Sequence, residues 1–169
     1  MIYFGLSIVI VIVDQFLKSY MSELLPLCEP GYCNSIEILP IFQFTLMHNS
    51  GAAFSFLSDA GGWQRWFLVT VSTVVSLIIG TWLFRVMASQ KILSFGLALV
   101  LGGALGNLID RAFVGYVVDF IVVHWEQYYF PAFNIADGAI FVGACFFILD
   151  IWINRAEENG VGNADGQKK

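Results

Sequence analysis

The sequence predicts an all-α membrane protein with four transmembrane helices, a small extracytoplasmic β-sheet and a short interfacial helix. Hydrophobic residues fill 58% of the 169 positions and charged residues only 12%, whereas a soluble domain carries roughly 25% charged residues. Four proline-free segments are also apolar enough to cross a hydrocarbon core of about 30 Å, which takes about 20 helical residues. These segments are residues 2–21, 66–84, 92–109 and 135–153.

The first span, residues 2–21, is expected to stay in the protein as a membrane helix rather than to be cleaved as a signal peptide. No charged region precedes it, and no small-residue cleavage site follows it. Asp14 and Lys18 interrupt its apolar run and share one helix face, where they can neutralise each other. The pair is either a structural ion pair or also part of a substrate site.

The distribution of Lys and Arg predicts how the chain crosses the membrane. Arg85 and Lys91 flank the turn at 86–91, and further basic residues follow the fourth span. Residues 22–64 and 112–134 contain no Lys or Arg. The positive-inside rule therefore places both termini and the short turn in the cytoplasm, and the two long connections outside.

The two outer connections differ in pattern. Residues 41–46 alternate apolar and polar side chains, which predicts short strands, with a turn near Ser50 and Gly51. The aromatic run "IVVHWEQYYF" in the second connection predicts a short helix at the membrane interface. Cys28 and Cys33 could join in an oxidising compartment or remain free thiols.

A single membrane-embedded domain over residues 1–155 follows from these spans, because no second apolar core or internal repeat is present. Residues 156–169 are polar and contain several glycines, so they are expected to form a disordered cytoplasmic tail.

The third span ends in "GGALGNLIDR", which places Gly103, Asn107 and Asp110 on one helix face. Small residues permit close helix approach, and an asparagine can hydrogen-bond across the contact. Asp110 and Arg111 then fall at the outer boundary of the membrane. The motif is either a packing contact with an interfacial ion pair or part of a polar site.

Asp119 and Asp137 are the most informative carboxylates. Asp119 stands alone in "YVVDFIVV", Asp137 opens the fourth span, and neither has a basic residue close by in the sequence. If the two meet, like charge prevents both from ionising at neutral pH, so they share a proton. One carboxylate can then take a proton from water while the other donates to a carbonyl oxygen. The reaction class would be amide hydrolysis without a covalent intermediate.

Several other functions fit the sequence poorly. The net charge of −5 and the absence of a basic stripe argue against a nucleic-acid partner. No G-x-S-x-G or H-E-x-x-H motif and no close His/Cys cluster is present, so neither a serine nucleophile nor a metal site is expected, and no cofactor.

Five blocks together resemble one family. They are "DQFLK" (14–18), "NSGAAF" (49–54), "GGALGNLIDR" (102–111), "VVDF" (117–120) and "FNIAD" (133–137). Their order and their places relative to four spans are similar to those of lipoprotein signal peptidases, also called signal peptidase II. The resemblance covers nearly the whole chain from the first span through the fourth. The "CEPGYC" segment is not one of the family's blocks.

The resemblance implies a bacterial inner-membrane aspartic endopeptidase. Such enzymes cut the signal peptide from prolipoproteins just before a cysteine that already carries diacylglycerol, and globomycin inhibits them. Asp119 and Asp137 match the catalytic pair, and the family analogy implies a monomer. Other positions match polar residues around that pair or the pair in the first span: Asn49, Asn107, Asp110, Arg111, Asn134, Asp14 and Lys18.

Two other membrane functions compete with this interpretation. A small transporter or channel subunit would use Asp14, Asp110 and Asp137 to relay protons or hold an ion. A presenilin-type or prepilin-peptidase-type protease would carry G-x-G-D inside a span, where this chain reads "NIADG".

Overall fold

The computed structural model describes residues 1–51 and 62–166, with side chains up to Asn154. Four helices in these ranges are long and apolar enough to cross a membrane, as the composition predicts. They are α1 (Ile2–Leu24), α2 (Trp63–Val86), α3 (Lys91–Phe113) and α4 (Ile135–Gly166), whose apolar part ends at Asn154. The expectation of a disordered tail at 156–169 stays a prediction, and the α4 backbone continues to Gly166.

Helix α3 is the centre of the bundle. Over half of its most apolar stretch, 56%, is buried, against 22% for α1 and 11% each for α2 and α4. Leu97, Ala98 and Leu101 of α3 form a core with Leu83 of α2. The other three helices expose large apolar side chains such as Phe16, Leu77 and Phe141. Apolar side chains can be exposed to lipid without a free-energy cost, so their exposure on these helices fits a membrane-embedded bundle.

Glycines set the spacing around α3. A Cβ at Gly102 would lie 2.9 Å from both the Ser7 carbonyl oxygen and the Ile10 Cβ of α1. A Cβ at Gly103 would collide with the carbonyl oxygen of Ala136, in the first turn of α4. The close helix approach expected from "GGALGN" is therefore confirmed, and it brings the start of α4 against α3.

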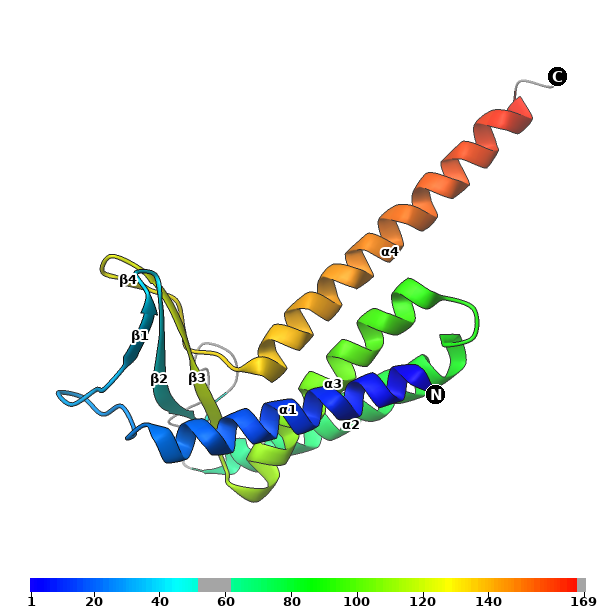
Figure 1. Ribbon diagram of the computed structural model, residues 1–169. Coiled ribbons are helices and arrows are strands. Elements are labelled where there is room, and N and C mark those ends of the chain that lie inside the picture. The colour runs from blue at the N-terminus through cyan, green and yellow to red at the C-terminus, as the bar shows by residue number, and fades with distance from the viewer. Residues whose placement is uncertain (52–61, 167–169) are drawn as a thin grey trace.

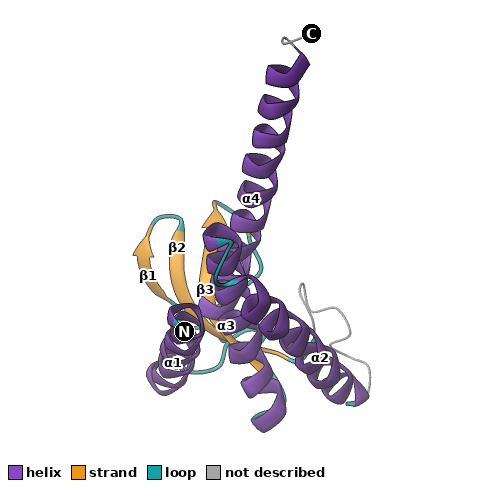
Figure 2. Ribbon diagram, turned by 90° about the vertical axis from the view of Figure 1, so that its right-hand side faces the viewer, coloured by secondary structure: helices purple, strands orange, loops and turns teal. Residues whose placement is uncertain are grey.

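The strands form one antiparallel sheet in the order β1-β2-β3-β4. They are β1 (Ile36–Leu39), β2 (Phe42–Asn49), β3 (Val117–Trp125) and β4 (Tyr128–Tyr129). The sheet lies at one end of the bundle, with its strands running across the direction of α1, while the N-terminus lies at the other end (Figures 1 and 2). We call this end, where α1 and α3 end and α2 and α4 begin, the sheet end.

One sequence prediction about the outer segments is wrong, and another stays a prediction. The hairpin turn between β1 and β2 lies at residues 40–41, and β2 continues to Asn49. The chain bends at Gly51, where the sequence also predicts a turn, and residues 52–61 beyond it lie outside the described residues. The second outer segment forms strands β3 and β4 instead of an interfacial helix. Its β-branched residues favour a strand, and β2 supplies the backbone partners, as in the pairing of Val118 with His48.

The first outer segment is attached to β2 before β1 begins. Cys28 and Cys33 form a disulfide, which resolves the two alternatives left by the sequence. The Cys28 N–H donates to the carbonyl oxygen of Leu46 in β2 at 2.9 Å. Leu25 and Leu46 are buried together with Val118 of β3. The end of α1 is thereby packed against the two strands that carry Asn49 and Asp119.

Candidate active site

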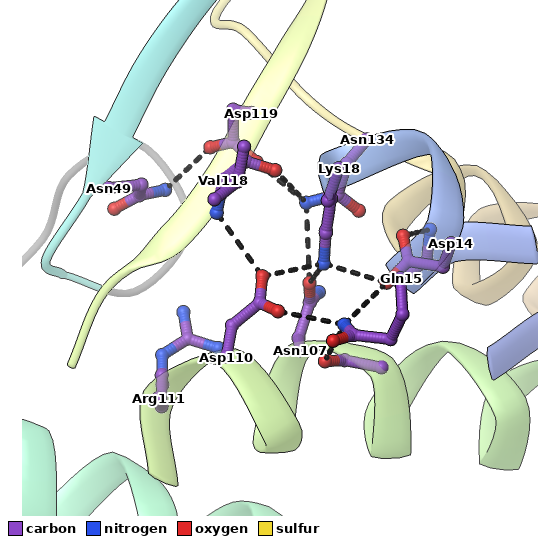
Figure 3. A network of polar contacts seen from close by, with 12 residues as sticks. Asp14, Gln15, Lys18, Asn49, Asn107, Asp110, Arg111, Val118, Asp119 and Asn134 are labelled. Carbon is purple, nitrogen blue, oxygen red and sulfur yellow. Dashed lines mark hydrogen bonds and ion pairs between the residues drawn. The ribbon is translucent and has the colours of Figure 1, made fainter. Parts of the chain in front are cut away.

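Asp119 is the third residue of β3 and is 3% exposed. Its Oδ2 accepts a hydrogen bond from Asn49 Nδ2 at 3.1 Å, and its Oδ1 accepts one from Asn134 Nδ2 at 2.7 Å. Asn49 ends the neighbouring strand β2, and Asn134 immediately precedes α4. Two amide side chains from separate elements therefore fix the orientation of the Asp119 carboxyl (Figure 3).

Asp137 lies in the first turn of α4, where it forms a capping box with Asn134. The Asp137 N–H donates to Asn134 Oδ1 at 3.0 Å, and the Asn134 N–H donates to Asp137 Oδ2 at 3.3 Å. Negative charge is favoured at a helix N-terminus. Asn107 of α3 adds a hydrogen bond from its Nδ2 to Asp137 Oδ1 at 2.8 Å. Local helix chemistry thus explains how a carboxylate is held at the head of an apolar span.

Asn134 brings the two carboxyls into one network, although they are 18 positions apart in the sequence. It is fully buried. Its Nδ2 contacts Asp119 Oδ1, while its Oδ1 and backbone N–H contact Asp137. The same Nδ2 also lies 3.2 Å from Asn107 Oδ1. Both carboxyls are therefore hydrogen-bonded to the same residue.

The environment of Asp119 favours its protonated form. Burial, followed by the charge of Asp137, raises the pKa of Asp119 from 3.8 to about 7. The hydrogen bonds from Asn49 and Asn134 and the charge of Lys18 oppose this shift, because each stabilises the ionised carboxylate. A carboxyl in this state can donate a proton at neutral pH.

Lys18 connects α1 to the same network. Its Nζ lies 2.8 Å from Asp14 Oδ2 and 2.8 Å from Asp110 Oδ2. It also donates to Asn107 Oδ1 at 3.0 Å, so all three ammonium protons have an acceptor. The Asp14 and Lys18 ion pair thus forms as the sequence predicts, and it is extended to α3.

Asp14 and Asp110 each also hold a backbone N–H. Asp14 Oδ1 accepts from the Ala136 N–H at 2.9 Å, which fixes the start of α4. Asp110 Oδ2 accepts from the Val118 N–H at 3.2 Å, which fixes β3 one residue before Asp119. The two carboxylates therefore tie both catalytic candidates to the helix bundle.

Gln15 belongs to this network but was not singled out by the sequence analysis. Its Nε2 lies 2.7 Å from Asp110 Oδ1, 3.2 Å from the Gly106 carbonyl oxygen and 3.3 Å from Asp14 Oδ2. An uncharged side chain in a span gives little functional signal. Its position beside Asp14 in "DQFLK" was the only indication.

Arg111 lies at the end of α3, beside the two carboxyls. Its Nη2 donates to the Gly51 carbonyl oxygen at 2.8 Å, which connects α3 to the chain after β2. Arg65 of α2 donates to the carbonyl oxygens of Arg111 and Ala112 at 2.9 and 2.8 Å, and so caps α3. Residues 52–54 of "NSGAAF" lie outside the described residues.

A groove with a volume of about 610 Å³ begins at Asp137 and follows α4 away from the sheet end. Asp137 and Arg111 stand at its polar end, whereas Ile140, Phe141 and Ala144 continue it along α4. The remaining lining residues are Asn49, Asn107, Val117, Phe130, Pro131, Ala132, Phe133 and Gly138. Within residues 1–51 and 62–154, no group of three His, Cys, Asp or Glu side chains is arranged to bind a metal.

Comparison with known proteins agrees with this geometry. The family model for signal peptidase (SPase) II matches residues 6–153. The chain belongs to the signal peptidase II family. All the polar residues described above lie within the matched range, and membership of this family makes the chain a peptidase.

Relatives named lipoprotein signal peptidase match this chain over most of their length. The lipoprotein signal peptidase of Alteromonas mediterranea is 48% identical over 92% of this chain and 84% of its own length. That of Acinetobacter baumannii is 47% identical over 89% of this chain and 82% of its own length. That of Pseudomonas putida is 46% identical over 92% of this chain and 90% of its own. A solved bacterial membrane enzyme aligns with a TM-score of 0.73 and 28% identity, over 92% of this chain and 90% of that chain.

Proposed function

We propose that the chain is an aspartic endopeptidase whose catalytic residues are Asp119 and Asp137. It removes signal peptides from diacylglyceryl-modified bacterial prolipoproteins and cuts before the lipidated cysteine. The observation that carries the proposal is Asn134, which hydrogen-bonds both carboxyls, and of these Asp137 lines an apolar groove. Family membership and the names of the relatives support the substrate class.

The environments of the two carboxyls support different roles. Burial and the charge of Asp137 raise the pKa of Asp119 to about 7, which favours Asp119 as the proton donor, whereas Asp137 lines the groove and acts as the base. Asp137 accepts a proton from a water molecule, whose oxygen attacks the scissile carbonyl carbon. Asp119 donates its proton to the carbonyl oxygen. The tetrahedral intermediate then collapses: the C–N bond breaks, the amine nitrogen takes the proton from Asp137, and the hydroxyl proton returns to Asp119.

The groove suits a substrate that remains in the bilayer. An acyl-modified peptide can place its bond beside Asp137 while an apolar chain lies against Ile140, Phe141 and Ala144. Asn49 and Asn107 reach the polar end of the groove and can hydrogen-bond extended backbone without adding charge. Arg111 supplies a positive charge there, and Asp14, Lys18, Asp110 and Asn134 position the other side chains.

The family resemblance supports the cellular setting, and the distribution of charge supports the orientation. The enzyme lies in the bacterial inner membrane with both termini in the cytoplasm and the active site at the outer, periplasmic face. It works as a monomer, surrounded by membrane lipid, and globomycin-type inhibitors occupy the groove. Nucleic acid is not a partner.

Substitution of each carboxyl tests the proposal. Asp119→Asn and Asp137→Asn remove the acid and the base, so each should lower processing of a diacylglyceryl prolipoprotein by at least about 100-fold. The measurement is the rate of mobility shift of a purified lipidated substrate in detergent or nanodiscs. Asp150→Asn is the matched control, because Asp150 lies on the same helix and contacts only Asn154 among the described residues. Wild-type rates in either dyad variant would contradict the assignment.

A further inference from the structure

Asp110 has two carboxylate oxygens with different partners. Oδ2 accepts from Lys18 and from the Val118 N–H. Among the described residues, Oδ1 accepts only from Gln15, at 2.7 Å. Lys18 cannot serve Oδ1 as well, because its three protons already contact Asp14, Asp110 and Asn107. The buried Asp110 carboxylate, 4% exposed, therefore depends on the Gln15 amide for its second oxygen.

The acids in this cluster outnumber the ammonium, so they need donors besides Lys18. Asp14 and Asp110 are two buried carboxylates, and Lys18 is the one buried ammonium between them. Gln15 lies against both acids and adds two N–H donors without adding charge. Gly106 makes room for this contact, because a Cβ there would lie 2.6 Å from Asp14 Oδ2.

We propose that Gln15 is a positioning residue for the peptidase reaction, an inference that rests on the proposed function. Its amide holds the Asp110 carboxylate in the rotamer that accepts the Val118 N–H, and Val118 immediately precedes Asp119 in β3. The Val118 carbonyl oxygen also accepts from Asn134 Nδ2 at 3.3 Å. Loss of the Gln15 donor leaves Asp110 Oδ1 without a partner, so the carboxylate turns and β3 shifts at Asp119.

Two substitutions at this position test the proposal. Gln15→Met keeps the size of the side chain but cannot donate, so kcat should fall about 10- to 100-fold, as small misplacements of reacting groups do. KM should change by less than about twofold, since Gln15 does not line the groove. Gln15→Glu can donate an O–H only when it is protonated, so its activity relative to Gln15→Met should rise as the pH is lowered.

The pH dependence separates this role from a merely structural one. The charged groups facing position 15 are Asp14 and Lys18 on its own helix and Asp110 on α3. Asp119 on β3 and Asp137 on α4 are connected to this cluster through Asn107 and Asn134. Activities are therefore expressed relative to wild-type enzyme at each pH. Gln127→Met, in the exposed turn between β3 and β4, is the matched control and should retain full activity.

Two results would overturn the role of Gln15 while leaving the proposed function intact. One is a wild-type kcat in Gln15→Met. The other is a ratio of Gln15→Glu to Gln15→Met activity that stays constant with pH. A wild-type enzyme without activity on a lipidated prolipoprotein would instead contradict the proposed function itself.

Discussion

Asn134 performs two tasks with one side chain. Its Oδ1 completes the first turn of α4 by accepting the Asp137 N–H, and its Nδ2 contacts the Asp119 carboxyl. The side chain that caps α4 therefore also aligns the two acids. A hydroxyl cap such as serine could satisfy the helix but would be too short to reach β3 as well.

Asn49 sets the pH range over which Asp119 keeps its proton. Its amide donates to Asp119 Oδ2, and this bond stabilises the ionised carboxylate and lowers the pKa. Asn49→Ala removes the donor, so the pKa of Asp119 rises further above its ordinary value. Activity that requires protonated Asp119 should then persist to higher pH. The alkaline limb of the kcat profile should move up by about one pH unit, while the maximal rate falls.

The control for this prediction is Asn34→Ala, which removes an exposed asparagine whose Nδ2 contacts Tyr32. Its pH profile should coincide with that of the wild type. A shift of the Asn49→Ala limb to lower pH would contradict the assignment of Asp119 as the proton donor.

Single residues differed in how far the sequence could identify them. Asp119 and Asp137 could be selected because a carboxylate without a local basic partner is unusual in an apolar segment. Gln15 could not, since it is uncharged and its partner Asp110 is 95 positions away. The bond from Lys18 to Asn107, which spans 89 positions, could not be predicted for the same reason.

Whole elements show the same contrast between local and long-range information. The four spans follow from apolar length, which lipid requires of any helix that crosses it. The sequence predicts a helix where β3 lies, because the aromatic end of this segment resembles an interfacial helix. Pairing with β2 determines that this segment is a strand, as in the pairing of Met47 with Asp119. The two paired strands are about 70 residues apart in the sequence. A strand therefore carries Asp119 to the head of α4.

Gly103 controls the contact between α3 and α4. A Cβ at this position would collide with the carbonyl oxygen of Ala136, one residue before Asp137. Gly103→Ala should therefore push the start of α4 away from α3. The expected result is a loss of about 1–3 kcal/mol of stability, since overpacking has this typical cost, together with reduced processing. Thermal unfolding in detergent and the substrate assay measure the two effects.

Gly5→Ala is the comparison for that experiment, because a Cβ at Gly5 has no neighbouring atom within 4 Å. It makes the same chemical change in α1 and should leave the unfolding temperature unchanged or slightly raised, as alanine favours helices. Equal unfolding temperatures for Gly103→Ala and Gly5→Ala would show that the α3–α4 contact tolerates a methyl group.

At the scale of the molecule, the polar network lies where two kinds of structure meet. Helices α1, α3 and α4 contribute Lys18, Asn107 and Asp137, whereas the sheet contributes Asn49 and Asp119. The helices can be stable in lipid on their own, because their backbone groups are paired internally. The sheet end is where irregular backbone and charged groups collect, so a reaction that needs water is best placed there.

The direction of the whole chain in the membrane is the remaining prediction. The turn between α2 and α3 is flanked by Arg85 and Lys91, whereas the sheet end holds the Cys28–Cys33 disulfide. Basic residues tend to stay in the cytoplasm and structural disulfides form in oxidising compartments, so both features predict that the sheet end lies outside.

Single free cysteines can test this orientation when they are introduced in a Cys145→Ala background that keeps the Cys28–Cys33 disulfide. In intact spheroplasts, a membrane-impermeant maleimide should label Gln127→Cys in the exposed turn between β3 and β4. Ser89→Cys, in the exposed turn between α2 and α3, should be labelled only after the membrane is permeabilised. Asp119 and Asp137 lie at the sheet end, so the same result would place the active site on the side where a lipidated signal peptide presents its cleavage site. Labelling of Ser89→Cys in sealed spheroplasts, with Gln127→Cys protected, would reverse the orientation and put the dyad on the cytoplasmic side.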